Sequence, residues 1–585
     1  MGNLQSSDVT PNTRTIRRQR SLPILSGLGL GCTSAHSVFG SDSSQEVSHF
    51  SLGLNEKHEK HKYSDQHSED PPASQIIPTS HVAYAPTADF PAAGASYVAY
   101  DQFLQEYPEY RQTWILDSLR RSDYRRLARL GETYVDYMGG SLYPESLIRV
   151  HADFLSDHIM GNTHSTSNSS KLSLKCADEA REAILSFFKA PSEYTVVFTP
   201  NASGALKLIG ESYPFTQGSK YVLCADSHNS VHGIREFATR AEADVVYIPT
   251  TNHGGFDARI AKTLLLQNRP RAKSPAPSLF AITGLSNISN SKIPLSIIEY
   301  ASSLGYHTLL DAAALAPTSP ISLSDTPVDA MAISFYKMFG FPTGVGALVV
   351  KKSFLRQLKR PWFAGGTVDV VQVPGNIITR SRHLHEQFED GTINYLTLSA
   401  VSDGLRFLSA YLPFLPLRLS CLTDYTVKAL SRLRHGPTGI PIVRILSRRP
   451  TNRIKSIGEQ SETGSIISLI FSFPTGEMIP NSFVEFSASK MNISLRTGCM
   501  CNPGGAAAIL GIEDHMQQLC PGATLKDFEQ VVGRELGVVR ISLGLGSNFQ
   551  DVWNVVEFAS IMGNERSRNQ LWDSWLDACG IGHAI

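Results

Sequence analysis

Short, mostly apolar runs alternate with helical patterns between residues 97 and 400, and this alternation constrains the fold more than any other feature. The runs begin at residues 195, 221, 245, 279, 308, 330 and 346 and read TVVF, YVLC, VVYI, LFAI, TLLD, AMAI and GALVV. Helical patterns, among them 103–128 and 175–188, precede or separate them. Alternating strand and helix signals predict an α/β fold with a mainly parallel sheet of seven strands.

The pattern changes after residue 400. A long helical pattern over 396–412 leads into a segment with fewer strand signals, such as SIISLIFSF from residue 465. We therefore predict a large α/β domain over 131–400 and a smaller α+β domain over 401–585. Helices over 96–130 are expected to pack with the smaller domain. Trp572 and Trp575, three residues apart, predict one more helix that docks on the body.

Residues 1–95 have a different composition. They are rich in Ser, Thr, Pro and His and lack sustained periodicity, so they predict a disordered tail. His58 and His61 could form a metal site, but a solvated tail is the favoured interpretation. Met1, Gly2 and Ser6 fit a myristoylation pattern, whereas the Arg-rich, acid-poor start also resembles an organellar transit peptide. A plain basic tail is the third alternative and is favoured. We therefore expect a cytoplasmic protein, with a mitochondrial or a lipid-anchored protein as the alternatives.

Charge and cysteine content exclude several functional classes. Lys and Arg together number 53, as do Asp and Glu, which disfavours a dedicated nucleic-acid binder. No apolar run approaches the ~18 residues that a membrane span needs. Membrane contact is therefore expected only through an N-terminal lipid anchor. Eight cysteines in 585 residues form no disulfide framework, so reduced thiols are predicted.

Two charged residues lie at predicted strand ends, where α/β sheets bind ligands. Lys337 lies in SFYKMFGFPTGVGAL, between the runs AMAI and GALVV. A lone loop lysine is usually a solvated charge. Asp311 closes the run TLLD, and a buried acid is costly unless it meets a cation. The protonated ring nitrogen of pyridoxal 5'-phosphate (PLP) is such a cation. The alternative is a turn or helix-capping Asp.

Two further segments complete a constellation. His228 follows the run YVLC and could stack on a cofactor ring and shuttle protons, or could be a structural loop residue. Ala202, Ser203 and Gly204 lie between a strand run and a helical pattern, which favours a phosphate site at a helix N-terminus. A simple N-cap is the alternative. Taken together, these segments predict PLP held as a Schiff base on Lys337.

The order of phosphate turn, His, Asp and Lys resembles that of fold-type I PLP enzymes, specifically the class V aminotransferase and cysteine desulfurase group. The resemblance extends from about Tyr134 to Gly563. It is strongest to the N-terminal PLP domain of molybdenum cofactor sulfurases. The blocks that carry it are YVDYMGGSLYPES, GNTHSTSNSSKLS, DSHNSVHGIRE, FYKMFGFPTGVGAL, FEDGTINYL and SLRTGCMCNPG.

The resemblance implies a role for each matching residue. It implies that Lys337 binds PLP covalently, Asp311 pairs with the ring nitrogen, His228 stacks on the ring, and Ala202, Ser203 and Ser334 contact the phosphate. It also implies that Asn287 lies near the phenolic oxygen and the substrate, Arg540 binds the substrate carboxylate, Arg496 lies near the catalytic loop, and Thr392 reaches the phosphate of a partner subunit. The last role implies a homodimer.

Cys499 and Cys501 flank a single residue in RTGCMCNPG. A metal site is not predicted, because no second Cys/His pair at zinc spacing accompanies them. Two packing cysteines are the remaining alternative. In cysteine desulfurases with the pattern R-T-G-x-x-C, the last Cys is the nucleophile, which implies that role for Cys501. Cys499 could assist or relay sulfur.

The expected function is transfer of sulfur from L-cysteine, or a related amino acid, to Cys501 as a persulfide, with release of alanine. The chain ends at residue 585, so we expect no C-terminal domain for the molybdenum cofactor and a separate sulfur-acceptor protein. Ala314 and Tyr336 stand where many desulfurases have Gln and His, and CNPGGA replaces CNPGAC. A PLP-dependent lyase, aminotransferase or C–C bond-forming enzyme therefore stays open. Retention of Lys337 and Asp311 disfavours a non-catalytic partner protein.

Overall fold

All seven expected strands form, and they lie in one sheet. The computed structural model describes residues 94–271, 276–436 and 438–579. In spatial order the strands are β2 (Tyr194–Thr199), β8 (Gly346–Lys351), β7 (Ala330–Ser334), β6 (His307–Asp311), β5 (Leu279–Thr283), β3 (Lys220–Cys224) and β4 (Asp244–Ile248). Strand β8 is antiparallel to its neighbours β2 and β7, and all other neighbouring strands of this sheet are parallel. The prediction of a mainly parallel seven-stranded sheet is confirmed.

Alternate side chains of each strand enter two different cores, one on each face of the sheet. Val196 and Leu310 belong to the first core, whereas their neighbours Val197 and Leu309 belong to the second. Both faces are therefore buried, as a parallel sheet requires. The first core is covered by α5 (Asn168–Phe187), α9 (Ala258–Gln267), α10 (Ser296–Ser303) and α13 (Leu398–Tyr411). The second is covered by α6 (Ala202–Ser212), α7 (Asn229–His232), α8 (Arg235–Arg240) and α12 (Lys352–Leu355).

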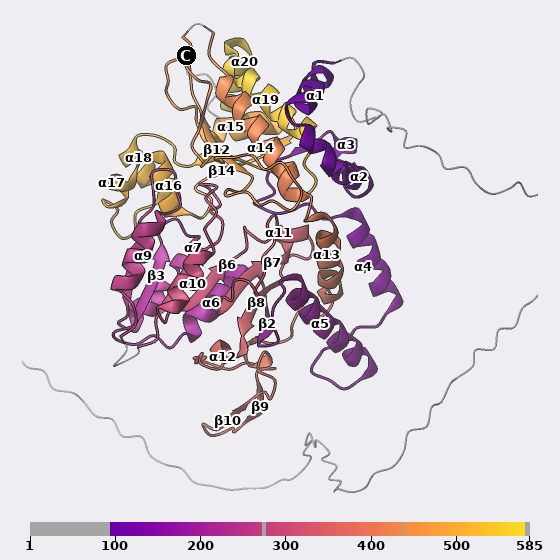
Figure 1. Ribbon diagram of the computed structural model, residues 1–585, viewed down its shortest axis with the longest axis vertical. Helices are drawn as coiled ribbons and strands as arrows, with labels where there is room; N and C mark the ends of the chain where they lie inside the picture. Colours follow the sequence, from indigo (N-terminus) through magenta and orange to yellow (C-terminus); the bar gives the residue numbers. More distant parts are fainter. Residues whose placement is uncertain (1–93, 272–275, 437, 580–585) are drawn as a thin grey trace, which may run out of the picture. The chain divides into compact units, whose positions relative to one another are not determined.

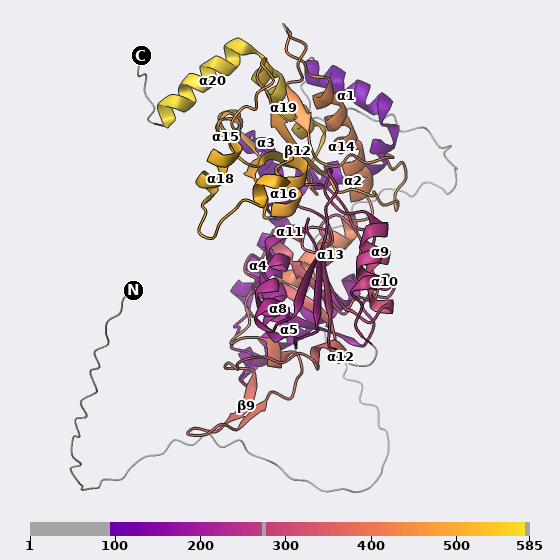
Figure 2. The same cartoon turned by 90° about the vertical axis from the view of Figure 1, so that its left-hand side faces the viewer.

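Four further parts belong to the region around the large sheet (Figure 1). Helix α4 (Glu145–Asp157) packs on α13, and the short α11 (Phe335–Phe339) follows β7 directly. An antiparallel hairpin of β9 (Val368–Val371) and β10 (Ile378–Arg380) extends from the end of the molecule below α12 (Figures 1 and 2). The short helix η2 (Glu386–Phe388) leads back towards α13.

A second, antiparallel sheet lies in the C-terminal region, which the sequence predicts to be a smaller domain. Its order is β11 (Val443–Ile445), β12 (Ile466–Phe471), β15 (Val538–Ser542) and β14 (Arg496–Gly498). The helices of this domain are α14 (Leu415–Arg432), α15 (Asn481–Lys490), α16 (Pro503–Leu510), α17 (Glu513–Met516), α18 (Leu525–Val532), α19 (Phe549–Gly563) and α20 (Glu565–Ala578). Strand β1 (Thr133–Tyr134) pairs with β13 (Ile493–Ser494), so the first residues of the predicted 131–400 region are bonded to the C-terminal region.

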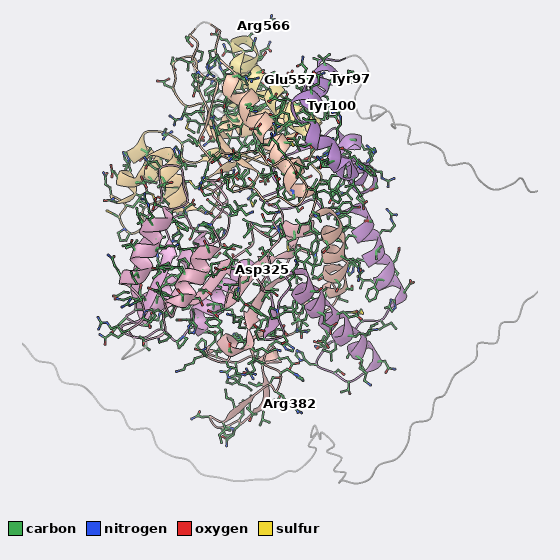
Figure 3. All side chains as sticks on the ribbon, in the orientation of Figure 1. Tyr97, Tyr100, Asp325, Arg382, Glu557 and Arg566 are labelled. Atoms are coloured by element: carbon green, nitrogen blue, oxygen red, sulfur yellow. The ribbon has the colours of Figure 1, made fainter. Side chains whose placement is uncertain are left out.

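The N-terminal helical pattern 103–128 is divided into several helices. These are α1 (Ala95–Glu106), η1 (Pro108–Thr113), α2 (Trp114–Asp123) and α3 (Arg125–Leu130). Pro108 explains the first break, because its ring has no N–H to continue α1. Helix α1 packs on α19, where Tyr100 lies 5.2 Å from Phe549 between ring centroids. Figure 3 labels Tyr97 and Tyr100 on α1 and Glu557 on α19.

The C-terminal helix docks as expected. Trp572 and Trp575 of α20 lie 4.7 and 5.5 Å from Phe483 of α15, measured between ring centroids. Residues 1–93 lie outside the described residues. The structure therefore does not test the predictions made there, which are the disordered tail, the histidines at 58 and 61 and the myristoylation or transit signals. Among the described helices, none is both long and apolar enough to cross a bilayer.

Candidate functional site

The carboxyl ends of the parallel strands meet at one edge of the large sheet, and a cavity of about 140 Å³ opens there. Its walls come from the segments that follow β2, β3, β5, β6 and β7. The residues that line it are Asn201, Ala202, Ser203, Leu206, His228, Asn287, Asp311, Ala313, Ala314, Ser334, Tyr336 and Lys337. The fold therefore brings together all the residues predicted to hold PLP within one subunit.

Lys337 enters the cavity from α11, directly after β7. Its side chain is largely buried, and burial lowers the pKa of Lys337 to about 8. The nearby carboxylate of Asp311 opposes this shift, whereas the charges of Arg540 and Arg496 add to it. A substantial fraction of this amine is consequently neutral near physiological pH, which is the form that reacts with a carbonyl group.

Asp311 ends β6 and is only 4% exposed. Its carboxylate accepts hydrogen bonds of 3.1 Å from Thr283 Oγ1 and from the backbone N–H of Ala313. No Lys or Arg forms an ion pair with it in the described part of the chain. Neutral donors alone compensate a buried carboxylate incompletely, so this environment suits a cationic partner in the cavity.

His228 also lines the cavity, in the turn after β3. Its backbone N–H donates to Thr283 Oγ1 at 2.9 Å, and its Nδ1 accepts from the N–H of Ser230 at 3.1 Å. Burial lowers the pKa of His228, with Asp311 acting against this shift and Lys337 with it. The lowered pKa favours the neutral imidazole, and because Nδ1 accepts, that form carries its proton on Nε2. Thr283 links His228 to Asp311, a role that the sequence did not reveal.

The turn Asn201–Ser203, which the sequence predicts to bind a phosphate, lines the cavity as well. Helix α6 begins at Ala202, and the Oδ1 of Asn201 caps it by accepting from Gly204 N–H at 2.9 Å. The Ala202 N–H donates to Ser334 Oγ at 2.8 Å. This contact confirms that the turn and Ser334 are adjacent, as a shared phosphate would require. A Cβ at Gly346 would lie 2.6 Å from the Cα of Asn201, so only glycine allows β8 to pass this close.

These side chains fit PLP, which carries a carbonyl, a basic ring nitrogen, a flat ring and a phosphate. Lys337 offers an amine, Asp311 an unpaired carboxylate, His228 a flat face and α6 the N-terminus of an 11-residue helix. The amide oxygen Oδ1 of Asn287 is buried without a hydrogen-bond partner among the described residues. A buried polar atom without a partner is uncommon and indicates a place for a ligand group.

The two predicted substrate arginines lie next to the cavity rather than in its wall. Arg540, on β15, donates from Nη2 to Asp136 Oδ1 at 2.6 Å and from Nη1 to the carbonyl of Asn287 at 3.3 Å. Arg496 donates from Nε to the other oxygen of Asp136 at 2.9 Å. One carboxylate thus orients both guanidinium groups. Sequence reasoning missed Asp136, because its partners lie far away in the chain.

The two neighbouring cysteines differ in environment. Cys501 is exposed, whereas Cys499 packs against a hydrophobic cluster that contains Ile288 and Val538. Burial raises the pKa of the Cys499 thiol, and the charge of Glu529 adds to this effect. A buried thiol with a raised pKa is a weak nucleophile at neutral pH. Of the pair, Cys501 is therefore the residue suited to attack a substrate.

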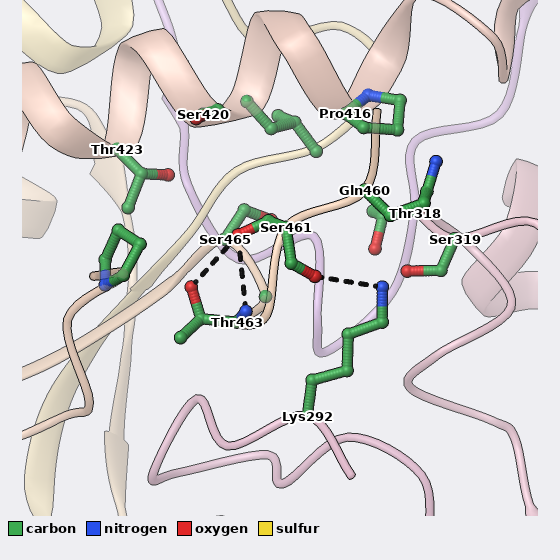
Figure 4. Close-up of a pocket in the computed structure, with 13 residues that line it drawn as sticks. Lys292, Thr318, Ser319, Pro416, Ser420, Thr423, Gln460, Ser461, Thr463 and Ser465 are labelled. Atoms are coloured by element: carbon green, nitrogen blue, oxygen red, sulfur yellow. Dashed lines mark hydrogen bonds between the residues drawn. The ribbon is translucent and has the colours of Figure 1, made fainter. Parts of the chain in front are cut away.

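Thr392 is the one predicted cofactor residue outside the cavity. It lines a neighbouring pocket together with Asn201 and Lys207, and its Oγ1 accepts from Asn162 Nδ2 at 3.2 Å. Its role towards a partner subunit's phosphate stays a prediction. A second buried lysine, Lys292, lies in a further pocket of Ser, Thr and Gln side chains with no acid or His among its lining residues (Figure 4). That pocket does not offer the groups that PLP requires.

The lowered pKa of Lys337 leads to a direct test on cofactor-free protein. After reductive methylation with ¹³C-formaldehyde, we expect the Lys337 signal to titrate near pH 8, whereas exposed lysines titrate near the usual value of ~10.4. The physical reason is that burial destabilises the ammonium form. Lys337→Arg assigns the signal. A Lys337 signal that titrates with the exposed lysines would show that the amine is solvated.

Comparison with known proteins agrees with this geometry. The sequence profile of the family Aminotransferase class-V matches residues 133–439. The chain is 35% identical over 468 residues to a molybdenum cofactor sulfurase of Bos taurus, covering 76% of this chain and 51% of that protein. It is 31% identical over 495 residues to one of Solanum lycopersicum, covering 78% and 59%. The chain thus spans between half and three fifths of the length of these relatives.

Solved structures show the same fold. A cysteine desulfurase of Thermococcus onnurineus superposes with a TM-score of 0.60 at 20% identity, covering 76% of this chain and 97% of that chain. A cysteine desulfurase of Escherichia coli gives 0.58 at 18% identity, with 78% and 98% covered. These structures have the fold of type I PLP enzymes. The family match over residues 133–439 and the residues of the cavity lead to one assignment: the chain belongs to the aminotransferase class-V family of PLP-dependent enzymes.

Proposed function

We propose that this enzyme removes sulfur from L-cysteine and holds it as a persulfide on Cys501 for transfer to an acceptor. The observation that carries the proposal is the position of Cys501. Its thiol is exposed, and its backbone carbonyl accepts a 2.8 Å hydrogen bond from Asn229, the residue after His228. Residues 499–502, between β14 and α16, carry both cysteines and are called the cysteine loop below. This loop is thereby bonded to the turn after β3, which lines the cofactor cavity. Relatives named molybdenum cofactor sulfurases and structural neighbours named cysteine desulfurases support the same chemistry.

Arg540 is the proposed anchor for the substrate's carboxylate. Its side chain is 3% exposed, and its Nε is buried without a hydrogen-bond partner among the described residues. A guanidinium with a remaining donor at a cavity can bind a carboxylate strongly. Asp136 keeps the group oriented and shares its charge, so the substrate meets a fixed rather than a mobile cation.

Bound PLP supplies an electron sink that stabilises negative charge at the α-carbon of an amino acid. Lys337 Nζ is placed to accept the α-proton, because its lowered pKa makes it a base near neutral pH. Cys501 Sγ then attacks the sulfur of the substrate and forms an S–S bond. The C–S bond breaks, its electron pair stays on the carbon fragment, and protonation of that fragment gives alanine.

The substitution Cys501→Ala tests this function. We expect the variant to retain PLP but to lose alanine formation from L-cysteine by at least ~10³-fold, because no thiolate remains to accept the sulfur. Alanine, sulfide and pyruvate are measured after incubation of the purified protein with L-cysteine. The matched control Cys499→Ala removes the more buried thiol two residues away and is expected to stay active.

Two results would contradict the proposal. Undiminished alanine formation by Cys501→Ala would exclude Cys501 as the nucleophile. Pyruvate in place of alanine from the wild-type enzyme would identify a β-eliminating lyase. A homodimer and a separate acceptor protein belong to the same proposal. Thr392 is consistent with the dimer, because it lines a neighbouring pocket and is not among the residues that line the cavity of its own subunit.

A further inference from the structure

Asp226 is a buried acid outside the set that we assign to PLP or substrate. It is 4% exposed and lies in the turn after β3. Its carboxylate accepts four hydrogen bonds, from Gly255 N–H at 2.8 Å, Ser286 Oγ at 2.8 Å, Ser289 Oγ at 2.6 Å and Asn502 Nδ2 at 3.2 Å. In the described part of the chain no Lys or Arg pairs with it. Burying a carboxylate with only neutral donors costs free energy. We therefore ask what the buried Asp226 contributes in return.

The fourth donor supplies the answer, because Asn502 belongs to the cysteine loop. Its side chain is fully buried, and it directly follows Cys501. The backbone of the same loop is held a second time, since Asn229 N–H donates to the carbonyl of Cys501 at 2.8 Å. One short turn, residues 225–229, thus holds the loop through both Asp226 and Asn229 while also carrying His228.

The loop itself has a conformation that requires such support. Met500 and Cys501 have φ values of 54° and 59°, in the left-handed region that non-glycine residues avoid. Residues in such conformations persist only where the surroundings hold them. Beyond the loop, a Cβ at Gly505 would overlap Asp226 Oδ1, and a Cβ at Gly504 would overlap the carbonyl of Ala225. Both glycines let the start of α16 reach the acid.

We propose that Asp226 is a positioning residue that, through Asn502, fixes the Cys501 thiol relative to the cofactor cavity. The inference rests on the proposed function, since it assigns a purpose to holding Cys501. The carboxylate accepts the Asn502 amide, and the amide holds the loop backbone in its left-handed conformation next to the turn that carries His228. Asp226 itself is not among the residues that line the cavity.

Asn502→Ala tests the link, because it removes one donor of Asp226 and leaves the other three in place. We expect kcat for alanine formation to fall by roughly 10- to 100-fold, as small displacements of reacting groups do. KM for L-cysteine and the PLP content are expected to stay at wild-type values, since Arg540 and Lys337 are untouched. Hydrogen exchange in the peptide 499–505 is expected to accelerate. Asp226→Asn, which replaces an acceptor oxygen by a donor, is expected to act in the same direction.

Ser289→Ala is the matched control, because it removes a donor of Asp226 that does not belong to the cysteine loop. It is expected to keep the wild-type kcat and the wild-type exchange in 499–505. An Asn502→Ala enzyme with unchanged kcat and unchanged exchange would overturn the inference. A fall in PLP content that parallels the fall in kcat would also overturn it, since the role would then be cofactor retention.

The design separates this inference from the proposed function. If the wild-type enzyme forms no alanine from L-cysteine, the proposed function fails. The positioning role is then judged by hydrogen exchange and by the rate at which iodoacetamide alkylates Cys501. Faster exchange and altered alkylation in Asn502→Ala would support positioning, and wild-type values for both would exclude it.

Discussion

The Lys337→Ala variant is expected to fold, to bind PLP only reversibly and to lose turnover. Lys337 is the amine that lies in the same cavity as Asp311, His228 and the phosphate turn. Its removal eliminates both the covalent attachment and the base, and the loss of proton transfer alone is expected to lower the rate by roughly 10²–10⁴-fold. Borohydride reduction followed by mass spectrometry of peptides should find the cofactor on Lys337 in the wild type and on no lysine in the variant.

Lys292→Met provides the matched control for this experiment. Burial lowers the pKa of Lys292 to about 8, as it does for Lys337. The two lysines therefore differ in their surroundings rather than in basicity. Lys292 Nζ donates to the carbonyl of Ser461 at 3.3 Å, in a pocket of hydroxyl groups (Figure 4). Lys292→Met is expected to keep covalent PLP, and cofactor found on the Lys292 peptide of the wild type would refute the assignment of the cavity.

The large sheet was predictable because its signals are local. The inner strands are buried on both faces, so the sequence of each is a continuous apolar run that can be recognised without knowing its partners. The edge strand β4 is the exception, with Asp244 and Tyr247 exposed. The ends of these runs also predicted the site, since parallel strands present their carboxyl ends at one edge. The sequence alone was therefore sufficient to place Lys337 and Asp311 at that edge. The N-terminal region shows where apolar periodicity misleads. The pattern 103–128 predicts one continuous helix, but α1 ends before Pro108, which cannot continue it.

The polar residues that support the site could not be predicted in the same way. Asp136 and Arg540 are 404 residues apart in the chain, and Asp226 and Asn502 are 276 apart. From the sequence around them, Asp136 and Asp226 look like ordinary acids in turns, because their partners Arg540 and Asn502 are far away in the chain. Thr283 likewise reads as the last residue of a strand. Their roles depend on tertiary contacts, which a single sequence does not encode at short range.

Asp311→Asn is the second substitution with a large expected effect. Asp311 ends β6, opposite Thr283 in the register of the sheet, and lines the cavity. Its carboxylate accepts hydrogen bonds from two neutral donors and forms no ion pair with a Lys or Arg in the described part of the chain. Its proposed partner is the proton on the ring nitrogen of bound PLP. Loss of one member of a buried ion pair costs about 3–5 kcal/mol, which corresponds to roughly 10²- to 10⁴-fold in rate.

The measurement reports on the proton directly as well as on the rate. With PLP labelled by ¹⁵N in its ring, the wild type is expected to show a protonated nitrogen and Asp311→Asn a neutral one, because the amide cannot stabilise the positive charge. Thr283→Val leaves the carboxylate in place and removes one of its donors, so the nitrogen should stay protonated and the rate should fall far less. A ring nitrogen that remains protonated in Asp311→Asn would mean that another group holds the charge. Rescue of Asp311→Ala by a PLP analogue with a methylated, permanently cationic ring nitrogen would locate the whole effect at that atom.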